Sequence, residues 1–291
     1  MKKNLFALLL VATVVFALAP RSFSAPAQER ERRRTNTTTS TTTHTNTSSN
    51  TRDHDDDGDF QEKDEFRQSY QLAPAARVEV RGINGTVDIE TASGSTAEVH
   101  IVRSARNRDD LEFRKVIVEQ TANSLVVRGE NDRERNFGRN REVRQRVMLR
   151  LPRMIDLGVS GVNGRVGVGE IDGPVRLSGI NGKVDVAQAM GYSDISGING
   201  RVRVTITQLG ERGIHVSGVN GGVELLFAED LNADLDVTGI NGSVNPAVAN
   251  VTILGKIDRQ NFHAKIGGGG SPIKVSGING HVKLSRVGSP G

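Results

Sequence analysis

An acidic segment near the N-terminus has the residue types and the spacing of a calcium-binding loop. Asp53, Asp55 and Asp57 stand at positions 1, 3 and 5 of such a loop, Gly58 at position 6 and Asp64 at position 12. Carboxylate oxygens at these positions coordinate Ca²⁺, and the glycine permits the sharp turn between them. Position 12 is normally a bidentate glutamate, and the Thr-rich tract before the segment cannot supply an entering helix. The four aspartates are therefore a weak calcium candidate, and a solvated acidic linker is the simpler interpretation.

The most basic stretch of the chain holds nine arginines between Arg128 and Arg153. Such a stretch could contact anionic polysaccharide, lipid headgroups or nucleic acid. Acidic residues are interleaved with the arginines, and the alternation from Val143 to Leu151 predicts a strand with one solvated face. We therefore favour an ordinary exposed loop followed by an edge strand.

A twelve-residue unit occurs seven times along the chain. Its form is aliphatic-x-aliphatic-Ser-Gly-(Ile/Val)-Asn-Gly-x-Val-x-Val, and its asparagines are separated by 79, 18, 18, 21, 21 and 38 residues. A period near 20 is typical of stacked-repeat proteins, and the long first and last intervals predict degenerate copies between the recognisable ones. The units are Val78–Ile89, Leu157–Val168, Val175–Val186, Ser193–Val204, Ile214–Leu225, Leu235–Pro246 and Ile273–Leu284.

Each unit predicts two short strands joined by a turn, because its aliphatic positions fall on one face of each strand. Asn-Gly readily takes positive φ, so the chain is expected to turn there. A hairpin is the rival interpretation, but units that recur every 18 to 21 residues favour a coil with parallel strands. We predict an all-β fold: a single-chain parallel β-solenoid of about 10 coils, right-handed because parallel crossovers usually are.

Stacking of the units would place the repeat asparagines in a structural ladder. One amide can donate to the carbonyl of the amide below, as in the ladders of cross-β structures. A ligand or metal row is less favoured, since amides without carboxylates bind cations weakly. We expect at most partial exposure of these side chains and the smallest contribution from Asn279, at the end of the array. The ladder residues are Asn84, Asn163, Asn181, Asn199, Asn220, Asn241 and Asn279.

No fixed catalytic constellation accompanies the repeats. The outward positions after each Asn-Gly vary freely, although Asp185, Arg203 and Glu224 alternate in sign and suggest a surface charge ladder. We predict that the chain is not an enzyme and needs no cofactor. A polysaccharide-acting β-helix enzyme is the alternative, by fold analogy alone. It would need two convergent carboxylates, and the acids to consider are Asp172, Asp185, Asp194 and Asp236.

The chain divides into four expected segments. Residues 1–27 read as a signal peptide, with Lys2 and Lys3 before an apolar stretch from Leu5 to Ala19. Residues 28–65 are charged or rich in Thr, Ser and Asn and are expected to form a disordered spacer. The β-solenoid is expected at 66–287, and 288–291 is a short tail. The expected location is the periplasm, the cell surface or the extracellular space.

Composition excludes several classes of protein. The chain has no cysteine, which excludes a lipid-modified cysteine anchor, a disulfide framework and thiolate metal sites. Aromatic residues make up 4%, with no tryptophan, which argues against a carbohydrate cleft paved with rings. The formal net charge of +4 supports no inference about nucleic acid, and we expect none as a partner.

The stretches VMLRLP at 147–152 and LGVSGVNG at 157–164, with the later SGINGKV and SGINGRV, resemble the bacterial putative-adhesin domains and the related head domains named for Gly-Ile-Asn repeats. The resemblance spans residues 66–287. It implies a secreted or surface-exposed β-solenoid with an adhesin-like, non-enzymatic role and no catalytic residues to carry over. The expected partner is a cell-surface polysaccharide or an envelope protein, and an envelope structural or regulatory domain is a further alternative.

Overall fold

The computed structural model describes residues 60–131, 142–246, 251–254 and 261–288. Within these residues the chain is all-β, with one mixed sheet of 17 strands and a single short helix. The expected signal peptide and the spacer as far as residue 59 lie outside the described residues. The elements are β1 (Glu62–Gln71), β2 (Arg77–Arg81), β3 (Gly85–Ala92), β4 (Thr96–Ala105), α1 (Arg108–Phe113), β5 (Arg114–Thr121), β6 (Ser124–Asn131), β7 (Val143–Pro152), β8 (Asp156–Ser160), β9 (Asn163–Ile171), β10 (Val175–Gln188), β11 (Ser193–Ile206), β12 (Ile214–Asn220), β13 (Val223–Phe227), β14 (Ala233–Pro246), β15 (Val251–Ile253), β16 (Asn261–Ile266) and β17 (Ser271–Arg286).

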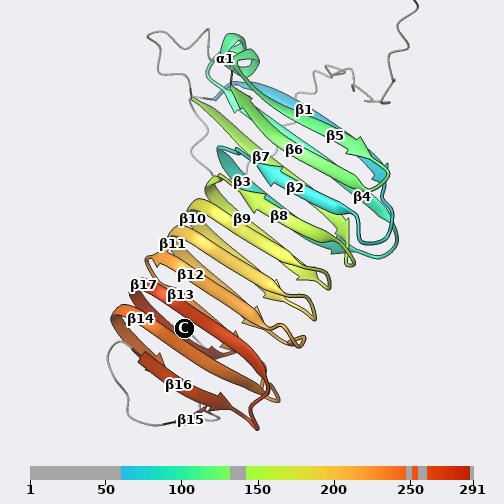
Figure 1. The fold of residues 1–291 in the computed structure, drawn as a ribbon. Helices are drawn as coiled ribbons and strands as arrows, with labels where there is room; N and C mark the ends of the chain where they lie inside the picture. The colour runs from blue at the N-terminus through green and yellow to red at the C-terminus, as the bar shows by residue number, and fades with distance from the viewer. Residues whose placement is uncertain (1–59, 132–141, 247–250, 255–260, 289–291) are drawn as a thin grey trace, which may run out of the picture. The chain divides into compact units, whose positions relative to one another are not determined.

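The sheet folds into two layers because every repeat bends in its middle (Figure 1). The pre-bend layer contains, in order of pairing, β5, β6, β2, β8, the first halves of β10 and β11, β12, the first halves of β17 and β14, then β16 and β15. The post-bend layer contains β1, β4, β7, β3, β9, the second halves of β10 and β11, β13 and the second halves of β17 and β14.

All seven repeats pair in parallel and in register. Asn181 lies opposite Asn163 on one side and Asn199 on the other, and Val184 lies opposite Val166 and Val202 in the same way. The Asn-Gly turns are therefore not antiparallel hairpins, and the parallel pairing expected from the repeat is present. The antiparallel strands at both ends make the sheet mixed, which the expectation of a purely parallel arrangement did not include.

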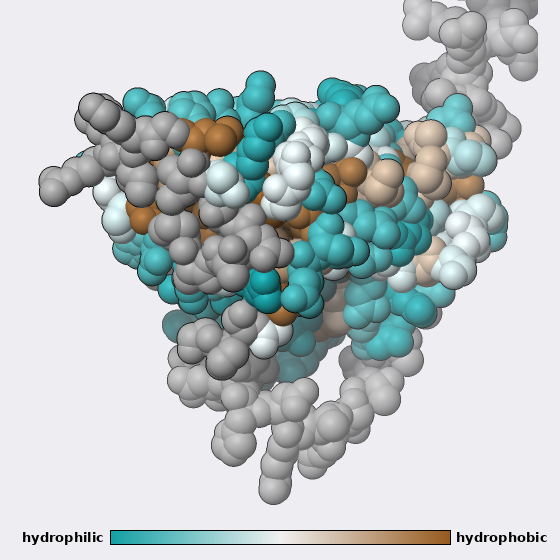
Figure 2. Space-filling model, turned by 90° about the horizontal axis from the view of Figure 1, so that it is seen from below, coloured by the Kyte–Doolittle hydropathy of each residue, from teal (hydrophilic) through white to brown (hydrophobic). Residues whose placement is uncertain are grey.

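The order of the last two repeats in the stack differs from their order in the sequence. β17 pairs with β12 and β13 on one side and with β14 on the other, so the last repeat lies between the fifth and the sixth (Figure 1). The 38-residue interval before Asn279 therefore contains no further parallel copy in the described residues. It forms β16, which pairs antiparallel with β14, and β15, which pairs antiparallel with β16, at the end of the molecule that faces the viewer in Figure 2. The expectation that Asn279 ends the array is wrong, because Asn241 occupies that place.

The first long interval is filled differently from the expectation. The first and second repeats are direct neighbours, through β2 with β8 and β3 with β9. The residues between them form β4 to β7 on the outer side of the first repeat, where β6 and β7 together add one parallel layer. Seven repeats and this layer make eight levels of parallel strands, fewer than the roughly 10 expected from the period. β7 pairs with both β3 and β4, so the prediction of an edge strand there is also wrong.

Two glycines build each bend. The first glycine, which follows Ser, Thr or, in the first repeat, Arg81, has φ between 60° and 69°. The glycine after Asn has φ between 145° and 159°, whereas none of the repeat asparagines has positive φ. A Cβ on the second glycine would lie only 1.7 to 2.0 Å from a backbone carbonyl oxygen of the neighbouring level. The bends therefore touch backbone to backbone, and only glycine fits. The second glycines are Gly85, Gly164, Gly182, Gly200, Gly221, Gly242 and Gly280.

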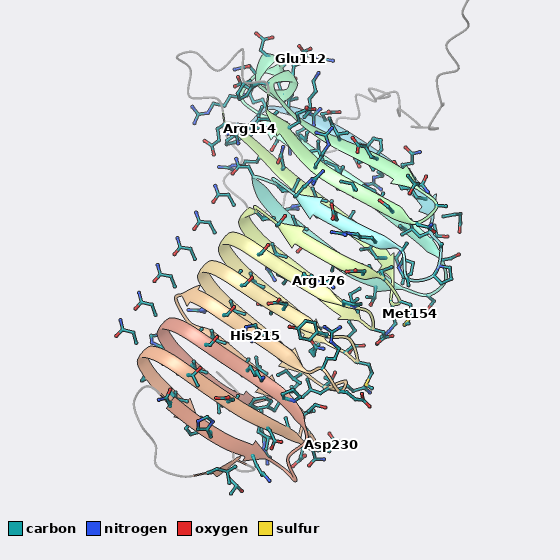
Figure 3. The ribbon with its side chains drawn as sticks, viewed as in Figure 1. Glu112, Arg114, Met154, Arg176, His215 and Asp230 are labelled. Carbon is teal, nitrogen blue, oxygen red and sulfur yellow. The ribbon has the colours of Figure 1, made fainter. Side chains whose placement is uncertain are left out.

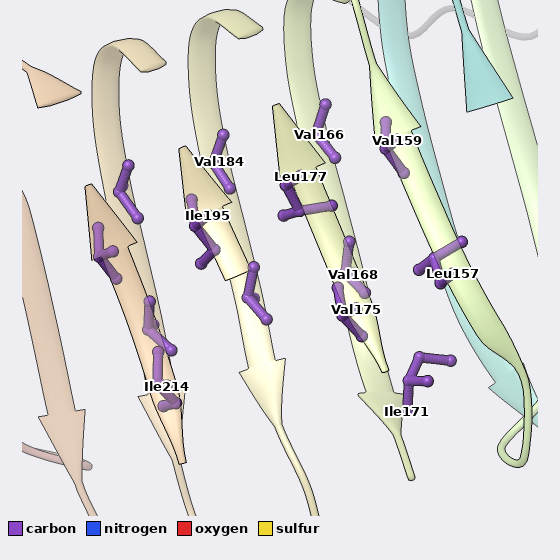
Figure 4. Packing of buried hydrophobic residues seen from close by; sticks show 14 of the residues in the cluster. Leu157, Val159, Val166, Val168, Ile171, Val175, Leu177, Val184, Ile195 and Ile214 are labelled. Atoms are coloured by element: carbon purple, nitrogen blue, oxygen red, sulfur yellow. The ribbon is translucent and has the colours of Figure 1, made fainter. Parts of the chain in front are cut away.

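Aliphatic side chains fill the space between the layers. Leu177 and Ile195 of the pre-bend layer lie beside Val166 and Val184 of the post-bend layer, and all four are fully buried (Figure 4). Each such side chain contributes about 1.5–3 kcal/mol on burial. One continuous cluster extends from Tyr70 to Leu284, so the antiparallel strands share the core of the repeats.

The first strand begins before the expected solenoid boundary at residue 66. Phe60 is buried, and the guanidinium of Arg144 lies 4.0 Å from its ring centroid. β1 then starts at Glu62. The N-terminus of α1 is capped by Asn107, whose side-chain oxygen accepts a hydrogen bond from the Asp110 N–H at 3.0 Å.

A helix long and apolar enough to cross a membrane does not occur in the described part of the chain.

The glycine contacts predict unequal effects of two neighbouring substitutions. Gly200→Ala should lower the free energy of unfolding by more than about 3 kcal/mol, because its Cβ would lie 1.8 Å from the Gly182 oxygen. Gly197→Ala should cost about 1–2 kcal/mol, because it meets only left-handed strain and an ordinary contact of 3.6 Å. Urea unfolding of both variants measures the difference, and equal costs would contradict backbone contact between the bends.

Candidate functional site

The outward side of the post-bend layer, here called the post-bend face, carries the side chains that follow each Asn-Gly. Because neighbouring strands are in register, the side chains at each outward position of the repeat form a row that runs across the strands. Successive side chains in a row are about 4.8 Å apart, which is the spacing of the strands. Three rows lie side by side: the asparagines, then the ninth repeat position, then the eleventh. The opposite, pre-bend face carries Arg176 and His215 (Figure 3).

The asparagine row is a continuous chain of six side-chain hydrogen bonds. From Asn163 onward, each Nδ2 donates to the Oδ1 of the preceding asparagine at 3.0 to 3.2 Å, in the order Asn84, Asn163, Asn181, Asn199, Asn220, Asn279 and Asn241. An amide carries two N–H donors and two acceptor sites. An interior asparagine thus keeps one donor and one acceptor site for solvent or a ligand.

The asparagines are more exposed than expected. Six of the seven are exposed, and only Asn84 is half-buried. Asn84 differs because β7 covers it: its Nδ2 donates to the Val143 carbonyl at 3.2 Å, and its backbone N–H donates to Gln145 Oε1 at 2.9 Å. The buried Gln145 thus closes this end of the ladder, a role that no repeat motif indicated.

The ninth-position row is basic over half its length. Arg146, Thr86, Arg165, Lys183 and Arg201 stand on five successive strands, with Thr86 opposite Arg146 and Lys183 opposite both Arg165 and Arg201. Thr86 is next to Arg165, since Val87 lies opposite Val166. Arg146 comes from the arginine run and the others from repeats, so the structure joins two basic features that are separate in the sequence.

The eleventh-position row continues the charge ladder. Arg203 Nε donates to Glu224 at 2.8 Å, and Lys283 approaches the other Glu224 oxygen at 3.5 Å. Partial burial alone would raise the pKa of Glu224, but the hydrogen bond and the charge of Arg203, with the charge of Lys283, lower that pKa overall. The acid therefore stays ionised between two cations, which fits a structural role.

An open hollow of about 780 Å³ lies beside these rows. Gly167, Gly169 and Ala187 line it and leave room because they carry little or no side chain. Charged residues surround them: Arg150 lies 3.4 Å from Glu98 and 3.8 Å from Glu90, and these three line the hollow too. The sequence showed no sign of the hollow, since small residues at outward positions read as ordinary variation.

The four acids proposed for an enzyme do not meet in one site. Only Asp185 lines the hollow, and it pairs with Arg165 at 3.2 Å. Asp172 is bound by Arg153 at 2.9 and 3.2 Å, and this hydrogen bonding holds the pKa of Asp172 below its usual value. Asp194 stands on the pre-bend part of β11, and Asp236 on β14 lies 3.2 Å from His263. No pair of them converges as hydrolysis would require.

The calcium candidate falls mostly outside the described residues. Asp53, Asp55 and Asp57 belong to the undescribed part, and Asp64 lies in β1 with its carboxylate paired to Arg103. Within the described ranges, no three His, Asp or Glu side chains are grouped to hold a metal ion.

The arginine run is described only in part. Arg128 is held by Glu119 and Glu130, and these contacts raise its pKa. Arg150 and Arg153 are also ion-paired. The described part of the run is therefore partly neutralised, and Arg146 is the member that joins the ninth-position row.

Comparisons with known proteins found few similarities. No family model and no curated protein matched the chain. Among solved structures, it is similar to a putative cell adhesion protein from Clostridium sporogenes (TM-score 0.42, 10% identity, 76% of this chain and 99% of that chain). It is also similar to a putative adhesin from Bacteroides fragilis (TM-score 0.26, 12%, 76% and 96%) and a putative lipid binding protein from Parabacteroides distasonis (TM-score 0.25, 10%, 77% and 95%). At these TM-scores the likeness carries no argument about this chain.

The order of the ladder predicts which asparagine matters least. Asn199→Ala and Asn279→Ala should each cost about 1–2 kcal/mol, because each removes two hydrogen bonds, and Asn241→Ala about half as much. Chemical denaturation of the three variants measures these costs. If Asn279→Ala were the mildest, the position of β17 between β13 and β14 would be wrong.

Proposed function

We propose that this chain is a non-enzymatic, adhesin-like repeat protein that acts outside the cytoplasm and binds a cell-surface polysaccharide or an envelope protein. In this proposal the repeats form a right-handed parallel β-solenoid, and the post-bend face is the binding surface. The expected signal peptide and spacer would export the solenoid and hold it away from its attachment point.

The observation that carries the proposal is the register of the repeats. Equivalent outward side chains stand on successive strands at a spacing of about 4.8 Å. Hydrogen bonds between asparagines and backbone contact between glycines hold that spacing fixed. A rigid row of equivalent groups suits a ligand that is extended or that repeats, because the ligand can make several contacts without ordering the protein first.

The enzyme alternative has less support. Catalysis needs acids in a fixed constellation. Asp185, Asp194 and Asp236 lie on three different strands and Asp172 lies after the end of β9, each with its own surroundings as described above. A domain with a structural or regulatory role in the envelope would bind a protein partner through the same surface. The binding experiment described next therefore tests this alternative as well.

Since the chain has no cysteine, a single introduced cysteine can carry a bulky label at a chosen place. Thr205→Cys puts the label in the hollow of the post-bend face, and Ser196→Cys puts it on the pre-bend face of the same strand, β11. Mature protein, residues 28–291, would be tested against glycan, matrix-protein and envelope-extract panels before and after coupling to a polyethylene glycol maleimide.

We expect binding to at least one panel component, lost on labelling at position 205 and kept on labelling at position 196. Absence of binding to every component would contradict the adhesin-like role. Loss of binding with the label at position 196 but not at position 205 would show that the pre-bend face is the binding surface. Shortened glycan products after incubation would favour the enzyme.

A further inference from the structure

The basic row, defined as Arg146, Arg165, Lys183 and Arg201, has a destabilising arrangement of charge. Lys183 stands directly between Arg165 and Arg201 on adjacent strands, and all four side chains are exposed. Like charges directly opposite each other on neighbouring strands destabilise a sheet. The row therefore lowers the stability of the protein unless something outside it neutralises the charge.

The protein itself does little to neutralise the row. In the described part of the chain only Arg165 has an ion-pair partner, Asp185 at 3.2 Å, whereas Arg146, Lys183 and Arg201 have none. The fold does not require cations at this position, because the remaining repeats carry Gly222, Ser243 and His281 there. Arg146, Lys183 and Arg201 are thus free to bind an external anion.

The surroundings of the row indicate a narrow, extended ligand. The asparagine ladder lies on one side of the row, two residues or about 7 Å away along the strands. Each interior amide of the ladder has one free donor and one free acceptor site. On the other side lies the hollow, which is lined by Gly167, Gly169 and Ala187 and by charged side chains of both signs, among them Asp88, Asp185, Arg150 and Arg203. A chain laid across the five strands β7, β3, β9, β10 and β11 would meet a cation on four of them and amides beside it.

Other polyanions fit less well. Binding of single-stranded nucleic acid relies on aromatic side chains on which bases stack, and the three rows between β7 and β11 contain no aromatic residue. Insertion into a membrane surface needs large apolar side chains beside the charges, and in these rows only Met148 is large and apolar.

We infer that the basic row binds an extended anionic polysaccharide that carries carboxylate or sulfate groups. The guanidinium groups of Arg146, Arg165 and Arg201 pair with the anionic groups, for which planar two-point contacts are favourable. The asparagine ladder hydrogen-bonds sugar hydroxyls. This inference rests on the proposed function and names the ligand class of the same face.

The test uses linear polygalacturonate and dextran sulfate as probes and unmodified dextran as the neutral control. The variant Lys183→Gln with Arg201→Gln removes two cations from the row. Its matched control, Arg176→Gln with Lys274→Gln, removes two cations from the pre-bend face. Thermal unfolding confirms that both variants fold.

We expect the wild type and the matched control to bind both anionic probes and not dextran. Loss of the two row cations should raise Kd about tenfold and weaken its dependence on salt, because two ion pairs of roughly 0.7 kcal/mol each are removed. Equal affinities of the two double variants would overturn the inference, as would dextran binding as tightly as dextran sulfate.

Two more probes separate the macromolecular classes. Tighter binding to phosphatidylglycerol vesicles or to single-stranded DNA than to the anionic polysaccharides would overturn the assignment to polysaccharide. Binding to a neutral glycan or a protein without binding to either anionic polysaccharide would overturn this inference and leave the proposed function standing. Binding to nothing in either experiment would overturn both.

Discussion

Backbone contact between the bends is the constraint on which the rest of the structure depends. The second glycine of each bend lies so close to a carbonyl of the next level that no side chain can separate them. This contact forces neighbouring repeats to the same register, because a shift of one residue would put a Cβ into the contact. The register then brings the asparagine amides within hydrogen-bond distance and places aliphatic side chains in continuous columns inside. It also produces the rows on the outside.

The local structure could be read from the sequence, since alternation, the two glycines and the asparagine all occur within one unit. Which unit lies next to which could not be read in this way. The units are nearly identical, so either β14 or β17 could pack against β13. The order of the units in the sequence suggested β14 as the neighbour of β13, whereas the structure has β17 there. Similarly, β6 and β7 form a parallel level although they lack the repeat motif. Their buried aliphatic side chains continue the columns of the core, and Gln145 accepts a hydrogen bond from the Asn84 backbone where the next repeat would place an asparagine.

The binding face was predictable only in part. The residue types at the ninth position were visible in the sequence, but which of them form a continuous row depends on which strands are neighbours. Arg146 joins this row from outside the repeats. The exposure of the asparagines and the hollow beside them follow from side-chain size at outward positions, which alternation does not encode. A core of aliphatic residues and the contacts at the bends stabilise the fold enough to tolerate opposed like charges on its surface.

The order of the levels is tested most directly by finding which residue lies opposite Ser217. In the structure Ser217 lies opposite Ser276, and Thr238 lies on the far side of Ser276. Disulfide formation should therefore be efficient in the double variant Ser217→Cys with Ser276→Cys, because adjacent strands are about 4.8 Å apart. Ser217→Cys with Thr238→Cys should not form an intramolecular disulfide, because that distance is about twice as large. The reverse result would mean that the repeats stack in sequence order, and it would contradict the order of levels on which the ladder and the rows rest.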